Sequence, residues 1–133
     1  MTSALLSPPS VTARVPAKVN LELLVGPVRD DGFHTLSTVY QAVSLHDTVT
    51  VRPAQEWEVA VHGTFADGVP TTADNLALRA ATLLAEAADV VEPVHVTIRK
   101  EIPVAGGMAG GSADAAATPT GTPRPTAAPP SPR

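Results

Sequence analysis

The chain has 133 residues, enough for one domain, and its 9 Lys and Arg against 13 Asp and Glu give a net charge of −4. This balance argues against binding to nucleic-acid phosphates, which requires a cationic surface. Cysteine is absent, which excludes disulfides, thiolate catalysis and cysteine-ligated metals. No stretch approaches the roughly 20 apolar residues of a membrane helix, and no basic segment precedes an apolar run at the N-terminus. We therefore expect a cytoplasmic protein that binds neither nucleic acid nor a membrane.

The apolar pattern predicts strands first and helices later in the chain. Apolar and polar residues alternate at 19–25, 34–43, 48–51 and 57–61, which predicts four strands. The period becomes helical from Leu76 to Ala87, with Thr72 or Asp74 as candidate caps. A further strand is predicted at 94–98, and a helix start at 112–117 after a glycine-rich loop. This order indicates an α+β fold.

The C-terminal segment has a different composition. Residues 118–133 include six Pro and four Thr but no Leu, Ile, Val or aromatic residue. Such a segment buries too little apolar surface to offset the entropy lost on ordering. We therefore divide the chain into a folded domain, residues 1–117, and a disordered, low-complexity, Pro-rich tail, residues 118–133.

The glycine-rich loop is the most informative segment. Gly106, Gly107, Gly110 and Gly111 directly precede the second helix. Glycines permit left-handed backbone angles and a close approach of a ligand, and a helix N-terminus attracts phosphate. Ser112 could cap this helix or donate its hydroxyl to a phosphate oxygen, but it stands where a P-loop needs Lys, and the dinucleotide glycine spacing is absent. From composition alone, a flexible connector or a tightly packed turn fits the loop equally well.

Three motifs together resemble a known family. The sequence PVAGGMAGGSAD at 103–114 is similar to the ATP loop of the GHMP kinases, the superfamily of galactose, homoserine, mevalonate and phosphomevalonate kinases. The motifs PAKVNL at 16–21 and DGFHTL at 31–36 resemble those members that act on a cytidine-diphosphate-linked methylerythritol in non-mevalonate isoprenoid synthesis. Met108 and Ala109 stand where the family more often has Leu and Gly. The resemblance covers about residues 15–117.

The resemblance implies an incomplete N-terminal GHMP-kinase domain of the ribosomal protein S5 domain 2-like type. It implies ATP and Mg²⁺ as cofactors and phosphorylation of the 2-hydroxyl of the cytidine-diphosphate-linked methylerythritol, a small-molecule substrate. Lys18 would be catalytic, Asn20 would bind substrate, and Phe33 and His34 would contact cytosine; no residue is assigned to a metal. ATP binding is assigned to the loop, namely Pro103, Val104, Ala105, Gly106, Gly107, Met108, Ala109, Gly110, Gly111, Ser112 and Ala113.

Two parts that the family requires do not appear in the sequence. GHMP kinases need a catalytic Asp in a Gly-Ala-Asp-x-Pro-like stretch well after the ATP loop, and a second domain. We therefore expect a truncated or frame-shifted product without kinase turnover. Two alternatives stay open: a non-catalytic phosphate-binding α+β module, and another GHMP kinase with a different alcohol substrate.

Overall fold

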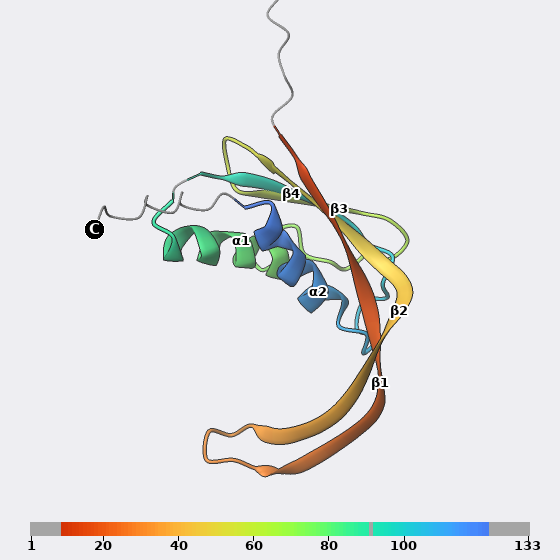
Figure 1. The fold of residues 1–133 in the computed structure, drawn as a ribbon. Helices are drawn as coiled ribbons and strands as arrows, with labels where there is room; N and C mark the ends of the chain where they lie inside the picture. The colour runs from red at the N-terminus through yellow and green to blue at the C-terminus, as the bar shows by residue number, and fades with distance from the viewer. Residues whose placement is uncertain (1–8, 91, 123–133) are drawn as a thin grey trace, which may run out of the picture.

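A computed structural model of the chain describes residues 9–90 and 92–122. Four strands form one mixed sheet in the order β1-β2-β4-β3, in which only β3 and β4 run parallel to each other. The helices lie on one side of this sheet (Figure 1). The predicted α+β class is confirmed. In chain order the elements are β1 (Val11–Val28), β2 (His34–Pro53), β3 (Glu58–His62), α1 (Leu76–Ala87), β4 (Val94–Arg99), α2 (Gly110–Ala117) and a 3₁₀ turn (Thr118–Thr120).

The core lies between the sheet and the helices. Alternate residues of a strand share one face, and those that face the helices are buried aliphatic side chains. Helix α1 matches its predicted range, but its cap is Asn75 rather than Thr72 or Asp74: Asn75 Oδ1 accepts the N–H of Ala77 at 2.9 Å. The buried core comprises Val49, Val51, Val59, Ala77, Leu78, Ala81, Val94, Val96, Ile98 and Ala117.

The two N-terminal strands are longer than predicted. The expected strands 34–43 and 48–51 are parts of one continuous strand, β2, and β1 begins at Val11 rather than at residue 19. Polar residues between the two alternating runs, Asp47 among them, predict a break there. In the structure this carboxylate is buried and bonded, so the strand continues through it.

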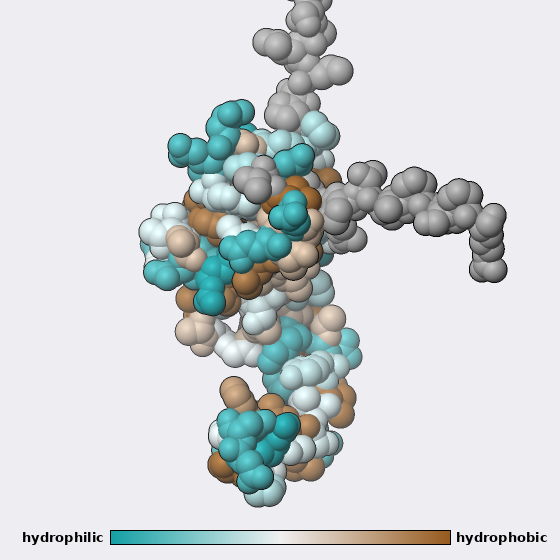
Figure 2. Space-filling view, turned by 90° about the vertical axis from the view of Figure 1, so that its left-hand side faces the viewer, coloured by the Kyte–Doolittle hydropathy of each residue, from teal (hydrophilic) through white to brown (hydrophobic). Residues whose placement is uncertain are grey.

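Strands β1 and β2 also extend past the core as a curved two-stranded ribbon (Figure 1). In the space-filling view the ribbon forms a separate lower lobe with apolar residues on its surface (Figure 2). Large apolar side chains at least half exposed on it include Leu21, Leu23, Leu24, Val25, Leu36, Val39 and Tyr40.

A bulge separates the ribbon from the core part of the sheet. Pro16 pairs with His46 and Lys18 pairs with Ala42, so two steps along β1 oppose four steps along β2. Before the bulge, odd-numbered residues such as Val15 pack on the core. After it, the even-numbered Lys18 contacts the glycine loop. The bulge therefore changes which residues of each strand face the helix side.

The packed structure continues beyond Ala117, where the folded domain was predicted to end. Helix α2 begins at Gly110, two residues before the predicted start, and the 3₁₀ turn follows it directly. Thr118 and Thr122 are buried, so the packed structure continues five residues beyond Ala117. The remainder of the predicted tail, residues 123–133, lies outside the described residues. Within residues 9–90 and 92–122, no helix has the length and apolar character needed to cross a membrane.

Candidate active site

The four loop glycines serve different purposes in the structure. Only Gly107 has a left-handed backbone, with φ of 72°. A Cβ on Gly110 would lie 2.7 Å from Lys100 Nζ, and one on Gly106 would lie 3.2 Å from Pro103 Cβ. A side chain at Gly110 would therefore displace a buried neighbour, and one at Gly106 would be tightly packed. Packing within the protein is a role that differs from the predicted approach of a ligand.

The loop also contains non-glycine residues in the left-handed region. Ala105 has φ of 57° and Ala109 has φ of 59°. Ala109 is the N-cap of α2 and makes no side-chain cap. Ser112 is exposed and lies within the helix, so the prediction that it could cap α2 is wrong. The first N–H groups of α2 therefore lack a capping side chain, as at many anion sites.

A cavity of about 420 Å³ opens beside this helix end. One wall is the loop, from Pro103 to Ser112, and another is the segment that leads into α1, including Pro70, Asn75 and Leu76. Asn75 is held rigidly there, since its Nδ2 donates to the Pro70 carbonyl at 2.8 Å. The predicted ATP-binding residues thus line a cavity in which backbone donors and apolar side chains meet, with the exception of Ala113, which is not in the lining.

Lys18 reaches the glycine loop from strand β1. Its Nζ donates to the Gly107 carbonyl at 3.0 Å and to Asn20 Oδ1 at 2.6 Å, and its backbone N–H donates to the Met108 carbonyl at 3.2 Å. The structure therefore brings the predicted catalytic residue, one predicted substrate residue and the predicted ATP loop to one place.

Asn20 and Lys18 are held by neighbours on the same face of the ribbon. Asn20 Nδ2 donates to Thr38 Oγ1 at 2.8 Å, and Thr38 Oγ1 donates to the Glu22 carbonyl at 2.7 Å. Lys18 Nζ lies 5.2 Å from the centre of the Tyr40 ring, within the range of a cation–π interaction. Tyr40 was not singled out by the sequence, where it is one of several alternating strand residues.

Phe33 and His34 lie at the other end of the ribbon. His34 pairs with Val28, whereas Ala42 pairs with Lys18, so the two positions are separated by eight residues of β2, about 26 Å measured along the strand. Phe33 is 72% exposed, and His34 Nδ1 lies 2.7 Å from the Gly26 carbonyl oxygen. In the structure this pair does not lie next to Lys18, although His34, Thr38 and Tyr40 are all even-numbered residues of β2.

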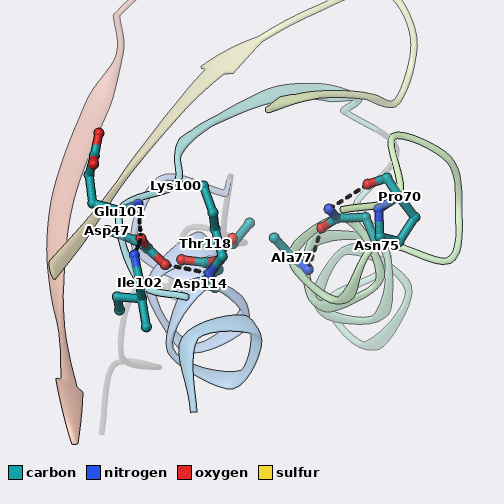
Figure 3. Close-up of polar contacts among 9 residues, drawn as sticks. All are labelled: Asp47, Pro70, Asn75, Ala77, Lys100, Glu101, Ile102, Asp114 and Thr118. Carbon is teal, nitrogen blue, oxygen red and sulfur yellow. Dashed lines mark hydrogen bonds and ion pairs between the residues drawn. The ribbon is translucent and has the colours of Figure 1, made fainter. Parts of the chain in front are cut away.

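Sequence reasoning missed a buried ionic cluster beneath the loop. Asp47, Lys100 and Asp114 come from three separate segments and are at most 3% exposed (Figure 3). Asp114 stands alone in a run of small residues, but Lys100 lies between Arg99 and Glu101, so its burial is not visible in the sequence. No spacing rule connects positions so far apart. Within the described part of the chain, no three His, Asp or Glu side chains gather as a cation site.

Comparison with known proteins gives the same family from sequence and from fold. Residues 75–122 match the GHMP kinases N terminal domain. A protein of Kineococcus radiotolerans is 66% identical over 103 residues, which cover 75% of this chain and 32% of that protein. A protein of Mycolicibacterium smegmatis is 58% identical over 100 residues, which cover 75% of this chain and 31% of that protein. Both are named 4-diphosphocytidyl-2-C-methyl-D-erythritol kinase.

Solved structures agree with this comparison. A crystal structure of a 4-(cytidine 5'-diphospho)-2C-methyl-D-erythritol kinase superposes with a TM-score of 0.62 and 39% identity, over 81% of this chain and 38% of that one. The homoserine kinase of Cytophaga hutchinsonii has a TM-score of 0.60 at 19% identity, over 84% of this chain and 34% of that one, which shows the shared fold alone. The chain spans about a third of the length of the curated relatives it matches. With its mixed sheet, glycine loop and helices, the chain belongs to the GHMP kinase family and has the fold of that family's N-terminal domain.

Proposed function

We propose that the chain is the nucleotide-binding part of an ATP-dependent kinase that phosphorylates the 2-hydroxyl of 4-diphosphocytidyl-2-C-methyl-D-erythritol. The observation that carries this proposal is the contact of Lys18 Nζ with the Gly107 carbonyl. It joins the one half-buried cation of strand β1 to the loop beside the cavity. A phosphoryl group held by the loop would therefore lie within reach of an ammonium group.

ATP would bind at the loop through backbone donors. The N-terminal N–H groups of α2 and the positive end of its dipole favour a polyphosphate there. The adjoining cavity has room for the rest of the nucleotide. Mg²⁺ would enter with the phosphates as MgATP and neutralise part of their charge during transfer.

Lys18 would stabilise the negative charge that develops on the transferring phosphoryl group. Asn20, which Thr38 fixes in place, would position the hydroxyl that receives the phosphoryl group. Because the ammonium bonds a carbonyl of the loop in the structure, its position is fixed before a ligand arrives. Such preorganisation lowers the cost of charge stabilisation in the transition state.

Phe33 and His34 would contact the cytosine of the substrate. A planar ring stacks on a base, and an imidazole hydrogen-bonds to its edge. The high exposure of Phe33 leaves its ring free for such a contact. The names of the relatives, which include the cytidine diphosphate group, support this substrate over mevalonate or homoserine.

A calorimetric titration of residues 1–133 with MgATP tests the nucleotide site. Gly107→Ala and Gly32→Ala form a matched pair, since both glycines have φ near +80° or +70° and no atom within 4 Å of an added Cβ. Both changes impose the same backbone strain, but only Gly107 belongs to the loop. We expect Gly107→Ala to weaken ATP binding by about tenfold or more and Gly32→Ala to leave it unchanged. Equal effects of the two variants would contradict the site.

The expectation that these 133 residues show no turnover stays a prediction. A coupled ADP-release assay with both substrates and Mg²⁺ tests it. A phosphate-binding module without catalysis would bind ATP equally well after Lys18→Ala and would never release ADP in a longer polypeptide. Substrate-dependent ADP release above that of Lys18→Ala would instead show that the 133 residues contain a working site.

A further inference from the structure

Three ionic side chains converge beneath the glycine loop. Lys100 Nζ donates to Asp47 Oδ2 at 2.5 Å and to Asp114 Oδ2 at 2.9 Å. Asp47 Oδ1 accepts the backbone N–H groups of Glu101 and Ile102, at 2.6 and 2.8 Å. The cluster therefore joins strand β2, the segment after β4 and helix α2, and it fixes the backbone from which the loop begins (Figure 3).

The ammonium of Lys100 lies directly under the start of α2. An added Cβ on Gly110, the first residue of that helix, would be 2.7 Å from Lys100 Nζ. Lys100 and Asp114 also line the cavity beside the loop. A cation at a helix N-terminus is unfavourable by itself, and a buried ionic cluster contributes little net stability compared with apolar packing. A role in positioning the loop accounts for this arrangement better than stability does.

The cluster contains two carboxylates and one ammonium, which leaves an excess negative charge when all three are ionised. Asp114 Oδ1 is buried and has no hydrogen-bond partner among the described residues. Burial, together with the neighbouring Asp47, raises the pKa of Asp114 from 3.8 to about 6 against the opposing effect of Lys100. Burial also disfavours the charged form of Lys100, but its two carboxylate partners outweigh this and raise its pKa. Asp114 is thus the member of the cluster that takes up a proton.

The other charged groups around the loop are few. Strand β1 contributes Lys18, which contacts the loop at Gly107 rather than the cluster. The segment before α1 contributes Asp74 at the rim of the cavity, and the 3₁₀ turn after α2 contains no ionisable residue. Asp114 is the one carboxylate of helix α2, whose N-terminus would hold a phosphate, and it lies 2.9 Å from Lys100 Nζ.

We propose that Asp47, Lys100 and Asp114 are positioning residues for the glycine loop, and that a polyphosphate bound at the loop and a proton on Asp114 favour each other. The inference rests on the proposed nucleotide site. A bound anion raises the cost of a negative charge on Asp114, and a neutral Asp114 leaves more of the Lys100 charge uncompensated beneath the phosphates. Affinity for ATP then rises as Asp114 becomes protonated, and ATP binding takes up protons.

The test is calorimetric titration of residues 1–133 with MgATP between pH 5.5 and 8 in buffers of different ionisation enthalpy. ATP titrates in this range as well, so each value is compared with Asp114→Asn, which keeps the shape of the side chain but removes its charge. We expect wild type to bind at least about fivefold more weakly than Asp114→Asn at pH 8, and about equally at pH 5.5. Wild type should also take up more protons than this variant near neutral pH.

Two further variants separate positioning from stability. Lys100→Met/Asp114→Asn leaves Asp47 with its two backbone donors, and we expect a cooperative thermal transition but about tenfold weaker binding with the pH difference abolished. Glu58→Gln removes an exposed carboxylate that bonds His95 and lies outside the cluster, and it should keep the wild-type profile. Identical pH profiles for wild type and Asp114→Asn would overturn this inference alone. No ATP binding by wild type at any pH would overturn the nucleotide site as well.

Discussion

Individual residues of the loop show where the structure stores strain. Ala109 occupies the left-handed region with φ of 59°, where an L-residue with a Cβ costs about 1 kcal/mol relative to glycine. Gly110 next to it has no such angle, yet it is the position at which a side chain would collide with Lys100. Adjacent residues of one loop are thus constrained by conformation in one case and by space in the other.

The variant Ala109→Gly should therefore stabilise the protein by about 1 kcal/mol. Gly110→Ala should destabilise it, because the added methyl group meets the buried Lys100 ammonium and the Ile102 side chain. Chemical denaturation of both variants measures the two effects. A loss of stability in Ala109→Gly would mean that the left-handed angle is not the dominant constraint at that position.

The charge of Lys18 should matter for the chemical step. In a polypeptide of the relatives' full length that carries these residues, Lys18→Ala should lower kcat by about 10²-fold and change KM much less. The reason is that the ammonium acts on charge that appears only in the transition state. Steady-state kinetics measure both constants. Arg14→Ala, which removes an exposed cation of the same strand, is the control and should leave kcat unchanged.

Asp114 predicts a specific dependence of stability on pH. Its pKa is raised in the folded state from 3.8 to about 6, so the unfolded chain loses this proton at lower pH than the folded chain does. Stability from this group is complete below about pH 4 and is lost as pH rises through about 6. The free energy of unfolding of wild type should therefore fall relative to Asp114→Asn between pH 4 and 7. Urea denaturation at both pH values measures the difference, and a constant difference would contradict the assignment.

At the scale of elements, the sequence predicts helices and strands that have a clear local period. It misses features that depend on a hydrogen-bond or ionic partner far away in the chain. Helix α1 and strand β4 match their predicted ranges because each has a clear period. Strand β2 was predicted as two strands because polar residues interrupt its alternation. Nothing near Asp47 in the sequence shows that Lys100 pairs with it. The cap of α1 was misplaced by one residue or more for the same kind of reason, since Asn75 is fixed by Pro70 as well as by the helix.

The β1–β2 ribbon should be the least protected part of the sheet. Within residues 9–90 and 92–122, the ribbon parts of these strands pair only with each other, and their large apolar side chains are exposed. Two-stranded structures of this kind are marginal in water. Hydrogen exchange should therefore be faster for the paired amides of 19–28 and 34–42 than for those of 48–52 and 94–99. Equal protection of the two regions would show that something else covers the ribbon.

At the scale of the whole molecule, the candidate site depends on contacts between segments far apart in the chain. Three motifs in the right order indicated the family and singled out Lys18, Asn20 and the loop, which the structure brings together. Their meeting point could not be read from spacing, since Lys18 and Gly107 are 89 positions apart. Tyr40 and the ionic cluster carry no motif at all, so only the folded structure associates them with the site.

The bulge opposite Ala17 also makes the site sensitive to any change in the alternation of β2 side chains between the two faces of the strand. Beyond it, side chains on even positions of β2, such as Thr38 and Tyr40, point the same way as the core residues on odd positions, such as Val49. Deleting a single residue between Val43 and Leu45 would leave every core contact in its frame and turn the distal half of the strand over. A chain with this deletion would fold around an intact hydrophobic core, but it would turn the opposite face of its ribbon toward a substrate.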